Sequence, residues 1–266
     1  MLSYRLNSSL YLLFALVAAL CCSGAGARAS ESAPGIAALV KSLAKPLKAA
    51  NAKNVVVLDI RTTSEKIHPV GVWLADQIST ELRAQYPAIH TIDRSQLRPD
   101  NNVVVFEAEA NQARAVGADV AVSGDFSAVS NRIGISLTLI QVARPTALET
   151  RTGTIPISKE ITDLTTEPLP PLELKDGFPQ AGRGGISMPV CTHCPPPMYG
   201  GMDGSVNLEV IVTTAGRPDR IKVVMTQIPD LTALAIRSVQ GWRFKPATGF
   251  DGKPVAVILP IWVTFK

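Results

Sequence analysis

The sequence is poor in histidine, cysteine and aromatic residues. Its 266 residues include only 3 histidines and 4 cysteines, and aromatic residues make up 5%. His68 precedes a proline in a loop and His90 lies inside a short predicted strand, so neither has the nucleophile neighbour of a hydrolase triad. The glycines of G-R-G-G (182–185) lack the strand and helix that flank a phosphate-binding loop. We therefore predict no catalytic, cofactor-binding or metal-binding residues, and a protein that is not an enzyme.

The sequence also lacks a block of like charges. The formal net charge is +4, from 26 basic and 22 acidic residues spread along the chain, so nucleic-acid binding has no electrostatic support. Hydrophobic residues make up 46% and charged residues 18%, which is typical of a globular protein. A chain of this length can hold two modest domains, each with its own core.

No apolar run is long enough for an ordinary membrane span of roughly 20 residues. The run Leu10–Cys22 follows Arg5 and precedes small residues, which is the pattern of a secretory signal peptide. We predict that residues 1–29 are this signal, with a retained short membrane anchor as the alternative. The protein is then exported to the periplasm or the membrane-associated envelope of a Gram-negative-type bacterium. Of its 4 cysteines, the mature chain keeps Cys191 and Cys194.

The first part of the chain alternates between strand and helix patterns. A helix is expected over 34–50, bent or broken at Pro46, because proline disrupts helix interiors. Further helices are expected at 71–86 and 106–117, and strands at 54–60, 89–93, 119–124, 133–142 and 149–157. This order predicts an α/β layer domain over 30–164.

Residues 165–188 are rich in proline and glycine and are predicted to be a linker. Beyond them, strand patterns at 206–212 and 220–225, a helix pattern at 229–242 and a strand pattern at 255–265 predict a small β-β-α-β domain over 189–266. The predicted fold class is α+β.

Cys191 and Cys194 stand in the sequence C-T-H-C, followed by three prolines. A c-type haem site would need a histidine where Pro195 stands. The prolines prevent a helix from continuing, and a redox dithiol uses such a helix to lower a thiol pKa. A zinc site needs four ligands, and only two thiols and His193 are present. We interpret the pair as a disulfide, or a reduced pair, that tightens the exit of the linker; a thiol oxidoreductase remains the second alternative.

The last 80 residues or so resemble the C-terminal domain of the TonB family. The resemblance is carried by P-P-P-M-Y (195–199), G-S-V-N-L-E-V-I-V (204–212), T-A-G-R-P-D (214–219) and W-R-F-K-P-A with D-G-K-P-V. Its signature residues are Trp242, Arg243, Phe244, Pro246, Gly252 and Pro254. The short helix that the family pattern places before the first strand is expected to be missing, because only residues 200–203 fill that gap.

Residues 54–164 resemble the α/β domain of the FlgO and CsgG type and the N-terminal domain of TolB. The matching stretches are V-V-V-L-D-I, G-V-W-L-A-D-Q-I-S-T-E-L, T-I-D-R-S-Q-L (91–97) and A-V-G-A-D-V-A-V-S-G (115–124). In those families this domain is a binding and assembly module of the envelope.

The TonB resemblance implies that a partner's strand adds to the C-terminal sheet. Pro260 has no N–H for a sheet ladder, so the last strand must lie at an edge or contain a bulge. The expected partner-binding residues are Val255, Val257, Leu259, Ile261, Val263 and Phe265. The implied partners are envelope proteins, with an outer-membrane transporter or a motor complex among them. The implied function is linked to energy transduction or transport at the outer membrane, and a structural adaptor without energy transduction is the alternative. Pro260 could instead protect the edge against strand pairing. The chain could also form homo-oligomers.

Overall fold

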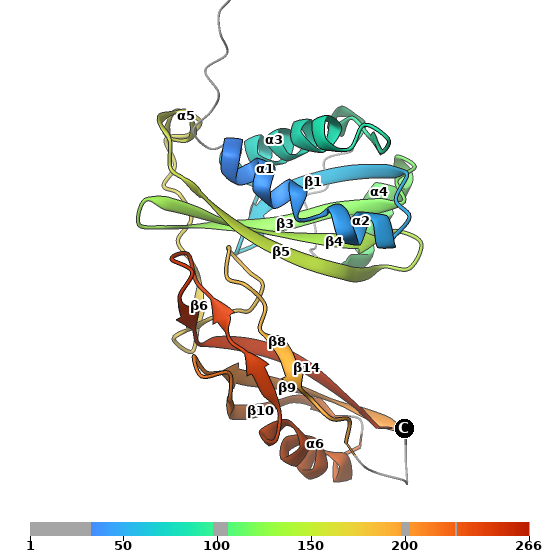
Figure 1. The fold of residues 1–266 in the computed structure, drawn as a ribbon, viewed down its shortest axis with the longest axis vertical. Helices are drawn as coiled ribbons and strands as arrows, with labels where there is room; N and C mark the ends of the chain where they lie inside the picture. Colours follow the sequence, from blue (N-terminus) through green and yellow to red (C-terminus); the bar gives the residue numbers. More distant parts are fainter. Residues whose placement is uncertain (1–32, 98–105, 198–202, 227, 266) are drawn as a thin grey trace, which may run out of the picture. The chain divides into compact units, whose positions relative to one another are not determined.

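The computed structural model describes residues 33–97, 106–197, 203–226 and 228–265, which fold into two main sheets with covering helices (Figure 1). The α+β class is as predicted from the sequence. The predicted signal segment 1–29 lies outside the described residues. The predicted loss of a helix at 200–203 also concerns residues that, apart from Asp203, are not described.

The larger sheet has five strands in the order β2-β1-β3-β4-β5. Its strands are β1 (Asn54–Thr62), β2 (His90–Thr91), β3 (Val120–Val129), β4 (Arg132–Gln141) and β5 (Thr146–Pro156). β1 pairs in parallel with β2 and β3, whereas β3, β4 and β5 form an antiparallel meander. The predicted strand at 89–93 is thus reduced to two residues.

Helices cover both faces of the larger sheet. Alternate residues of β1 divide between two cores, with Val55 and Val57 in one and Val56 and Leu58 in the other. The first core also contains residues of α1 (Ala33–Lys41), α2 (Ala44–Ala49) and α3 (Pro69–Gln85). The second contains residues of α4 (Phe106–Ala115). Short helical turns, η1 (Arg94–Gln96) and α5 (Lys159–Asp163), follow β2 and β5.

The expected leader helix is broken, but not at Pro46. α1 ends at Lys41 and α2 begins at Ala44, so the break falls at Ser42 and Leu43. Pro46 lies in the first turn of α2, where its missing N–H would have no partner within the helix. The break lets Leu43 and Leu47 both enter the first core.

The smaller sheet has the order β10-β9-β14 and is covered by one helix. Its elements are β9 (Gly204–Val212), β10 (Pro218–Thr226), α6 (Asp230–Gln240) and β14 (Val257–Phe265), which is the predicted β-β-α-β order. Leu231, Ala235 and Val239 of α6 are buried against alternate residues of β9 and β14. This packing leaves the other face of the sheet without a helix among the described residues.

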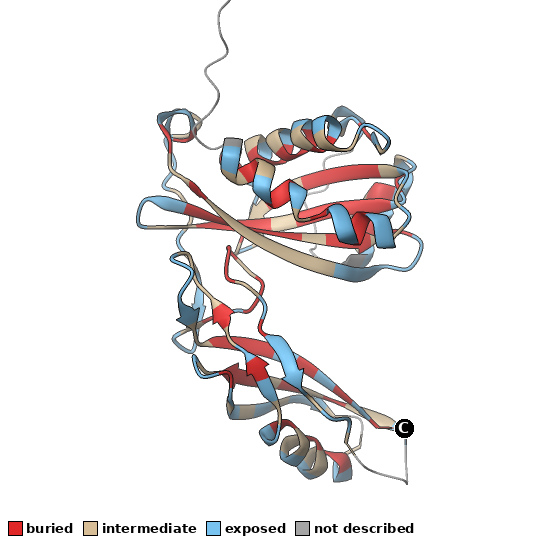
Figure 2. Ribbon diagram, viewed as in Figure 1, coloured by how far each residue is buried: buried red, intermediate tan, exposed pale blue. Residues whose placement is uncertain are grey.

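Residues 165–188, which we predicted to be a linker, pack against the rest of the chain. They contain a small hairpin of β6 (Leu174–Lys175) and β7 (Phe178–Pro179), and Ala181 and Ile186 are buried (Figure 2). Two further small pairings follow: β8 (Val190–His193) with β11 (Arg243–Lys245), and β12 (Ala247–Thr248) with β13 (Pro254–Val255).

Candidate protein-binding edge of the C-terminal sheet

β14 lies at one edge of the smaller sheet, because its full length pairs only with β9. The carbonyl of Ile258 accepts a hydrogen bond from the N–H of Ala181, at 2.9 Å, on the side away from β9. Since backbone groups alternate in direction along a strand, Pro260, Trp262 and Thr264 turn their backbone to the same outer side. The outer edge is therefore covered at Ile258, and its outward backbone groups at Pro260, Trp262 and Thr264 have no backbone partner among the described residues.

Pro260 stands at one of the outward positions, opposite Glu209 of β9. Its missing N–H thus costs the sheet no hydrogen bond, which explains why a proline is tolerated inside this strand. This alternation could have been read from the sequence. A proline in an edge strand must turn its nitrogen outward, so the residues two and four positions away share its side.

Most of the residues that we predicted at the partner-binding edge point into the core. Val257, Leu259, Ile261, Val263 and Phe265 are buried, and their backbone groups face β9. Val255 lies in β13, where it pairs with Ala247, because the long predicted strand is interrupted at residue 256. The sequence identified the strand but assigned the edge to the residues that alternate with the outward ones.

The uncovered face of the smaller sheet carries large apolar side chains. Trp262 is 54% exposed and Met225 is 52% exposed, and both lie opposite Asn207 of the central strand. The side-chain oxygen of Asn207 is buried and has no hydrogen-bond partner among the described residues. Trp262 was not predicted as a functional residue, although its outward register follows from Pro260.

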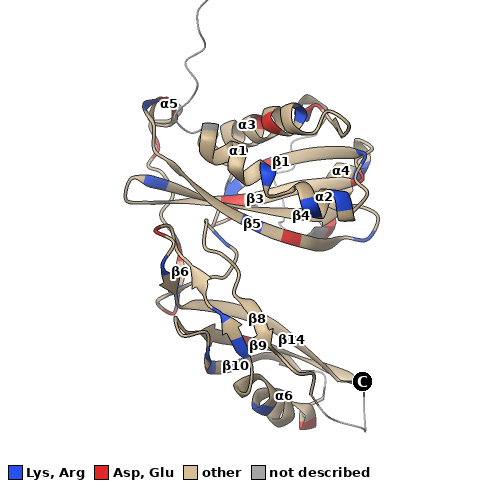
Figure 3. Cartoon of the chain, viewed as in Figure 1, with Lys and Arg blue, Asp and Glu red and all other residues tan. Residues whose placement is uncertain are grey.

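The hairpin β6–β7 lies against the other end of this face. Lys175 forms a salt bridge with Glu209, which raises the pKa of the Lys175 ammonium because the hydrogen bond favours its charged form. Figure 3 shows that basic and acidic residues are interspersed along the chain. The guanidinium of Arg220 lies 4.6 Å from the centre of the Phe178 ring, within cation–π distance. A cavity of about 220 Å³ remains here, lined by residues that include Asp176, Lys222 and Ile258.

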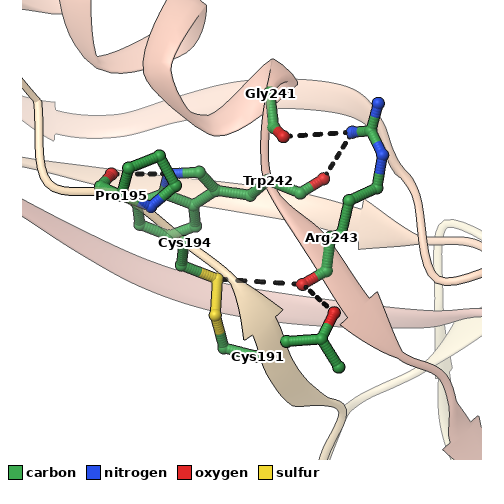
Figure 4. Close-up of a disulfide and its surroundings, with 7 residues drawn as sticks. Cys191, Cys194, Pro195, Gly241, Trp242 and Arg243 are labelled. Carbon is green, nitrogen blue, oxygen red and sulfur yellow. Dashed lines mark hydrogen bonds between the residues drawn. A yellow bond between two sulfur atoms is a disulfide. The ribbon is translucent and has the colours of Figure 1, made fainter.

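Cys191 and Cys194 are joined by a disulfide (Figure 4). Cys191 lies in β8, which pairs with β11, and is exposed to solvent; Cys194 directly follows β8. The Thr192 hydroxyl donates to the carbonyl of Arg243 at 3.0 Å, and the Cys194 Sγ lies 3.9 Å from the same oxygen. The disulfide therefore closes a small loop within the segment that pairs with β11, and Pro195 to Pro197 begin no helix beside it.

Trp242, Arg243 and Phe244 of the signature each have a structural role. The Trp242 indole N–H donates to the carbonyl of Pro195 at 3.0 Å, and Phe244 is buried in the core. The Arg243 guanidinium donates to the carbonyls of Gly241, at 3.2 Å, and Trp242, at 2.6 Å, next to the end of α6. A cation at a helix C-terminus is stabilising because the helix dipole is negative there.

The remaining signature residues shape a turn. Pro246 separates β11 from β12, and Pro254 begins β13. Between them, Gly252 has φ = +75°, and the Asp251 carboxylate accepts the N–H of Lys253 at 3.0 Å. This hydrogen bond lowers the pKa of Asp251. Trp242, Arg243, Phe244 and these turn residues thus support the sheet and do not line its free edge.

The two histidines that precede the C-T-H-C segment differ in their surroundings. His68 is buried and caps α3, its Nδ1 accepting the N–H of Val70 at 3.2 Å, while His90 is exposed on β2. Within the described residues, no group of three or more His, Cys, Asp or Glu side chains is placed to hold a metal ion. In the same ranges, no helix has both the length and the apolar character needed to cross a membrane.

The comparison with protein families identifies the last part of the chain. A family model described as the Gram-negative bacterial TonB protein C-terminal matches residues 198–266. Residues 198–266 are a TonB-type C-terminal domain. Domains of this type bind other proteins of the cell envelope. The comparison with curated proteins found no significant match.

Several solved structures are similar to parts of this chain. The LpoB C-terminal domain from Escherichia coli is 13% identical, with a TM-score of 0.40 over 48% of this chain and 99% of that chain. The Pseudomonas aeruginosa TonB C-terminal domain is 26% identical, with a TM-score of 0.26 over 34% of this chain and 93% of that chain. TolB from Acinetobacter baumannii is 12% identical, with a TM-score of 0.28 over 66% of this chain and 39% of that chain.

Proposed function

We propose that the protein is a cell-envelope binding protein whose TonB-type domain takes up an extended segment of a partner along the outer edge of β14. The observation that carries this proposal is the row of outward backbone groups at Trp262 and Thr264, which have no partner in the described residues. Strand addition uses such groups for affinity and neighbouring side chains for specificity. The exposed indole of Trp262 supplies an apolar contact on the open face beside this edge.

The other edge of the sheet is less suited to a partner strand. β10 pairs with β9 through two irregularities in register, between Asp219 and Lys222 and between Val223 and Met225. The pairing of β14 with β9 has none. Bulges twist an edge and protect it against further pairing, so β14 is the favoured site.

The packed segment 165–188 favours an adaptor over a long-range energy transducer. A transducer that crosses the periplasm needs an extended tether, whereas here Ala181 and Ile186 belong to the core of the C-terminal domain. We therefore propose an exported adaptor as the more favoured function, with energy transduction or transport at the outer membrane as the second. The proposed domains are 30–164 and 189–266; the proposed partners are envelope proteins, and homo-oligomers are one outcome of the test.

Photocrosslinking from single positions in cells of the source bacterium tests the site. A photoreactive residue at Thr264 is expected to crosslink a defined envelope partner, and the same residue at Val224 of β10 is not. Val224 is 51% exposed, so it is a matched control for accessibility. Crosslinks of equal yield from both positions, or from neither, would contradict strand addition at β14.

The mature N-terminus separates the two functions. A purified chain that begins near Ser30 has lost the apolar run and cannot be an anchored transducer. A chain that retains Leu10–Cys22 contradicts the signal-peptide prediction and favours transduction.

A further inference from the structure

One face of the larger sheet is buried although it carries small polar side chains. At one end of this face lie Ser127 and Asp125 of β3 and Ser136 of β4, which are 0%, 8% and 1% exposed. The apolar residues that alternate with them, such as Phe126 and Ile135, belong to the core on the opposite face. A buried polar row requires hydrogen-bond partners, because an unsatisfied buried polar group is costly.

The partners come from a loop that lies 49 to 59 positions away in the sequence. The N–H of Gly184 donates to the Asp125 carboxylate, and the Ser127 hydroxyl donates to the carbonyl of Gly184 at 2.9 Å. The N–H of Gly185 donates to the Ser136 hydroxyl at 3.0 Å. Three backbone groups of two consecutive glycines are thus bound by three side chains of the sheet.

The preceding residue supplies the charge. The Arg183 Nε lies 2.6 Å from the Asp125 carboxylate, its Nη2 pairs with Glu65, and Nη2 also donates to the carbonyl of Thr63 at 3.2 Å. Arg183 and Glu65 are the charged groups that act on Asp125. Glu109 of α4 lies nearby and interacts electrostatically with Arg61, Glu65 and Arg183. A carboxylate buried in this way needs a cationic partner, and Arg183 is that partner.

The close packing of the loop on the sheet requires glycine at two positions, Gly185 of the loop and Gly134 of β4. A Cβ on Gly185 would lie 2.4 Å from the Cα of Gly134, and a Cβ on Gly134 would lie 2.3 Å from the carbonyl oxygen of Gly184. Gly185 has φ = +88°, a backbone conformation that residues other than glycine rarely adopt. Phe250 also packs on Gly134. Charge, backbone hydrogen bonds and close packing therefore all specify the sequence Arg-Gly-Gly.

The same loop reaches β14. Gln180 forms a bridge with Ile258, and the N–H of Ala181 donates to the Ile258 carbonyl. The neighbouring strands β6 and β7 have only two residues each. Besides the contacts described above, few backbone hydrogen bonds therefore keep the segment in place. Of residues 180–185, only Ala181 belongs to an apolar core, so polar contacts hold most of the segment. Segments with few buried apolar contacts open at a lower free energy than the cores that they cover.

We propose that Asp125, Ser127, Gly134 and Ser136 form a binding groove for an Arg-Gly-Gly peptide, which residues 183–185 of the same chain fill reversibly. Opening of this clasp, the segment 180–185, uncovers the polar groove and the Ile258 end of the β14 edge. The effect on partner binding rests on the proposed strand addition, whereas the groove and its occupant do not.

Amide hydrogen exchange in the full chain tests the reversible opening. In the parent protein, the amides of Ala181, Gly184 and Gly185 are expected to exchange at least about tenfold faster than core amides of β3, through an opening that does not need global unfolding. Ser136→Ala removes one acceptor and is expected to speed these amides further, with core amides of β9 unchanged. Exchange of the clasp amides only by global unfolding would overturn the proposal.

A peptide added in trans tests the groove. The probe is a synthetic peptide with the sequence of residues 177–187, and the control peptide carries glutamine and valine in place of Arg183 and Gly185. The variant Gly185→Val, whose own clasp no longer fits, is expected to bind the probe and not the control. Adding Gly134→Ala to this variant blocks the groove and should abolish binding.

The outcome does not depend on finding a natural partner. Equal probe binding by parent and Gly185→Val, or binding that survives Gly134→Ala, would overturn the groove. Absence of probe binding by Gly185→Val would do the same if its core amides remain protected as in the parent. If Gly185→Val does not fold, the probe is added to Ser136→Ala and Arg183→Gln, which create no clash, and stronger binding than by the parent is the expected result. Absence of crosslinking from Thr264 would contradict the proposed strand addition but not the proposed groove.

Discussion

The indole N–H of Trp242 donates to the carbonyl of Pro195, one residue after the disulfide, at 3.0 Å. This hydrogen bond joins the entry of the C-terminal domain to the second residue after α6. The two segments also pair as strands, β8 with β11. The signature tryptophan and the C-T-H-C segment are therefore parts of one structural unit.

Replacing Trp242 with phenylalanine is expected to lower the free energy of unfolding by about 1 kcal/mol. The substitution keeps an aromatic ring but removes the N–H, and a net hydrogen bond contributes about 0.5–1.5 kcal/mol. Urea unfolding followed by circular dichroism measures the change. Trp262→Phe is the matched control, because the Trp262 side chain is exposed and forms no hydrogen bond with the described residues. Its replacement should change the free energy of unfolding by no more than about 0.5 kcal/mol.

Reduction of the disulfide is expected to destabilise the chain without abolishing the fold. Because only 3 positions separate the cysteines, the loop is small, and the chain-entropy relation gives about 2 kcal/mol for such a loop. Thermal unfolding of the parent with and without a reductant measures this. The double variant Cys191→Ser/Cys194→Ser should match the reduced parent and should not respond to reductant.

The same pair provides a test of the oxidoreductase alternative. The cysteines lie at an exposed strand and not at a helix N-terminus, which is the usual means of lowering a thiol pKa. We expect no reduction of insulin by the reduced protein above the rate with dithiothreitol alone. A rate that exceeds this background and disappears in the double serine variant would contradict a purely structural disulfide.

Much of the fold follows from local patterns in the sequence. The alternation of Val206, Leu208 and Val210 and the helical spacing of Leu231, Ala235 and Val239 identify the faces that the structure buries. Pro260 predicts an edge position because the missing N–H is a local property. These features depend on periods of two or 3.6 residues, which can be read without knowledge of distant contacts.

The contacts of residues 165–188 could not be predicted in this way. Proline and glycine in this segment exclude long helices and strands, and composition alone then suggests a free linker. What orders the segment is its fit to other parts of the chain, such as Gly185 against Gly134 and Arg183 against Asp125. These pairs are distant in sequence, and neither member of a pair indicates the other.

Pro260→Ala is expected to make the β14 edge more prone to pairing. The substitution adds an outward N–H next to the free backbone of Trp262, so that a longer run of donors and acceptors becomes available. Size-exclusion chromatography with light scattering should show more dimer or larger species than in the parent at the same concentration. The free energy of unfolding measured at low concentration should change little, because residue 260 is exposed.

Thr264→Ala is the control for this experiment. It alters a side chain on the same exposed face but leaves every backbone donor in place, so its oligomeric state should match that of the parent. If Pro260→Ala stays as monomeric as Thr264→Ala, the outer edge of β14 does not accept a strand even when its donor is restored.

Asp125 is expected to make stability depend on pH. Burial raises its pKa from the usual 3.8 to about 6, against the opposing effects of Arg183 and the Gly184 N–H. The folded state therefore binds this proton more tightly than the unfolded state does, so the contribution of Asp125 to the free energy of unfolding falls as pH rises from 4 to above 6. A difference of about two pKa units corresponds to about 3 kcal/mol at most.

Comparison of the parent with Asp125→Asn isolates this effect, because asparagine stays neutral. The free energy of unfolding of Asp125→Asn minus that of the parent should increase between pH 4 and pH 7. Asp251→Asn is the control with the opposite sign: the pKa of the exposed Asp251 is lowered by its hydrogen bonds with Lys253, so the parent gains stability relative to this variant as pH rises. A difference for Asp125→Asn that is flat over this range would mean that water reaches the carboxylate, and that residues 183–185 do not keep it buried in solution.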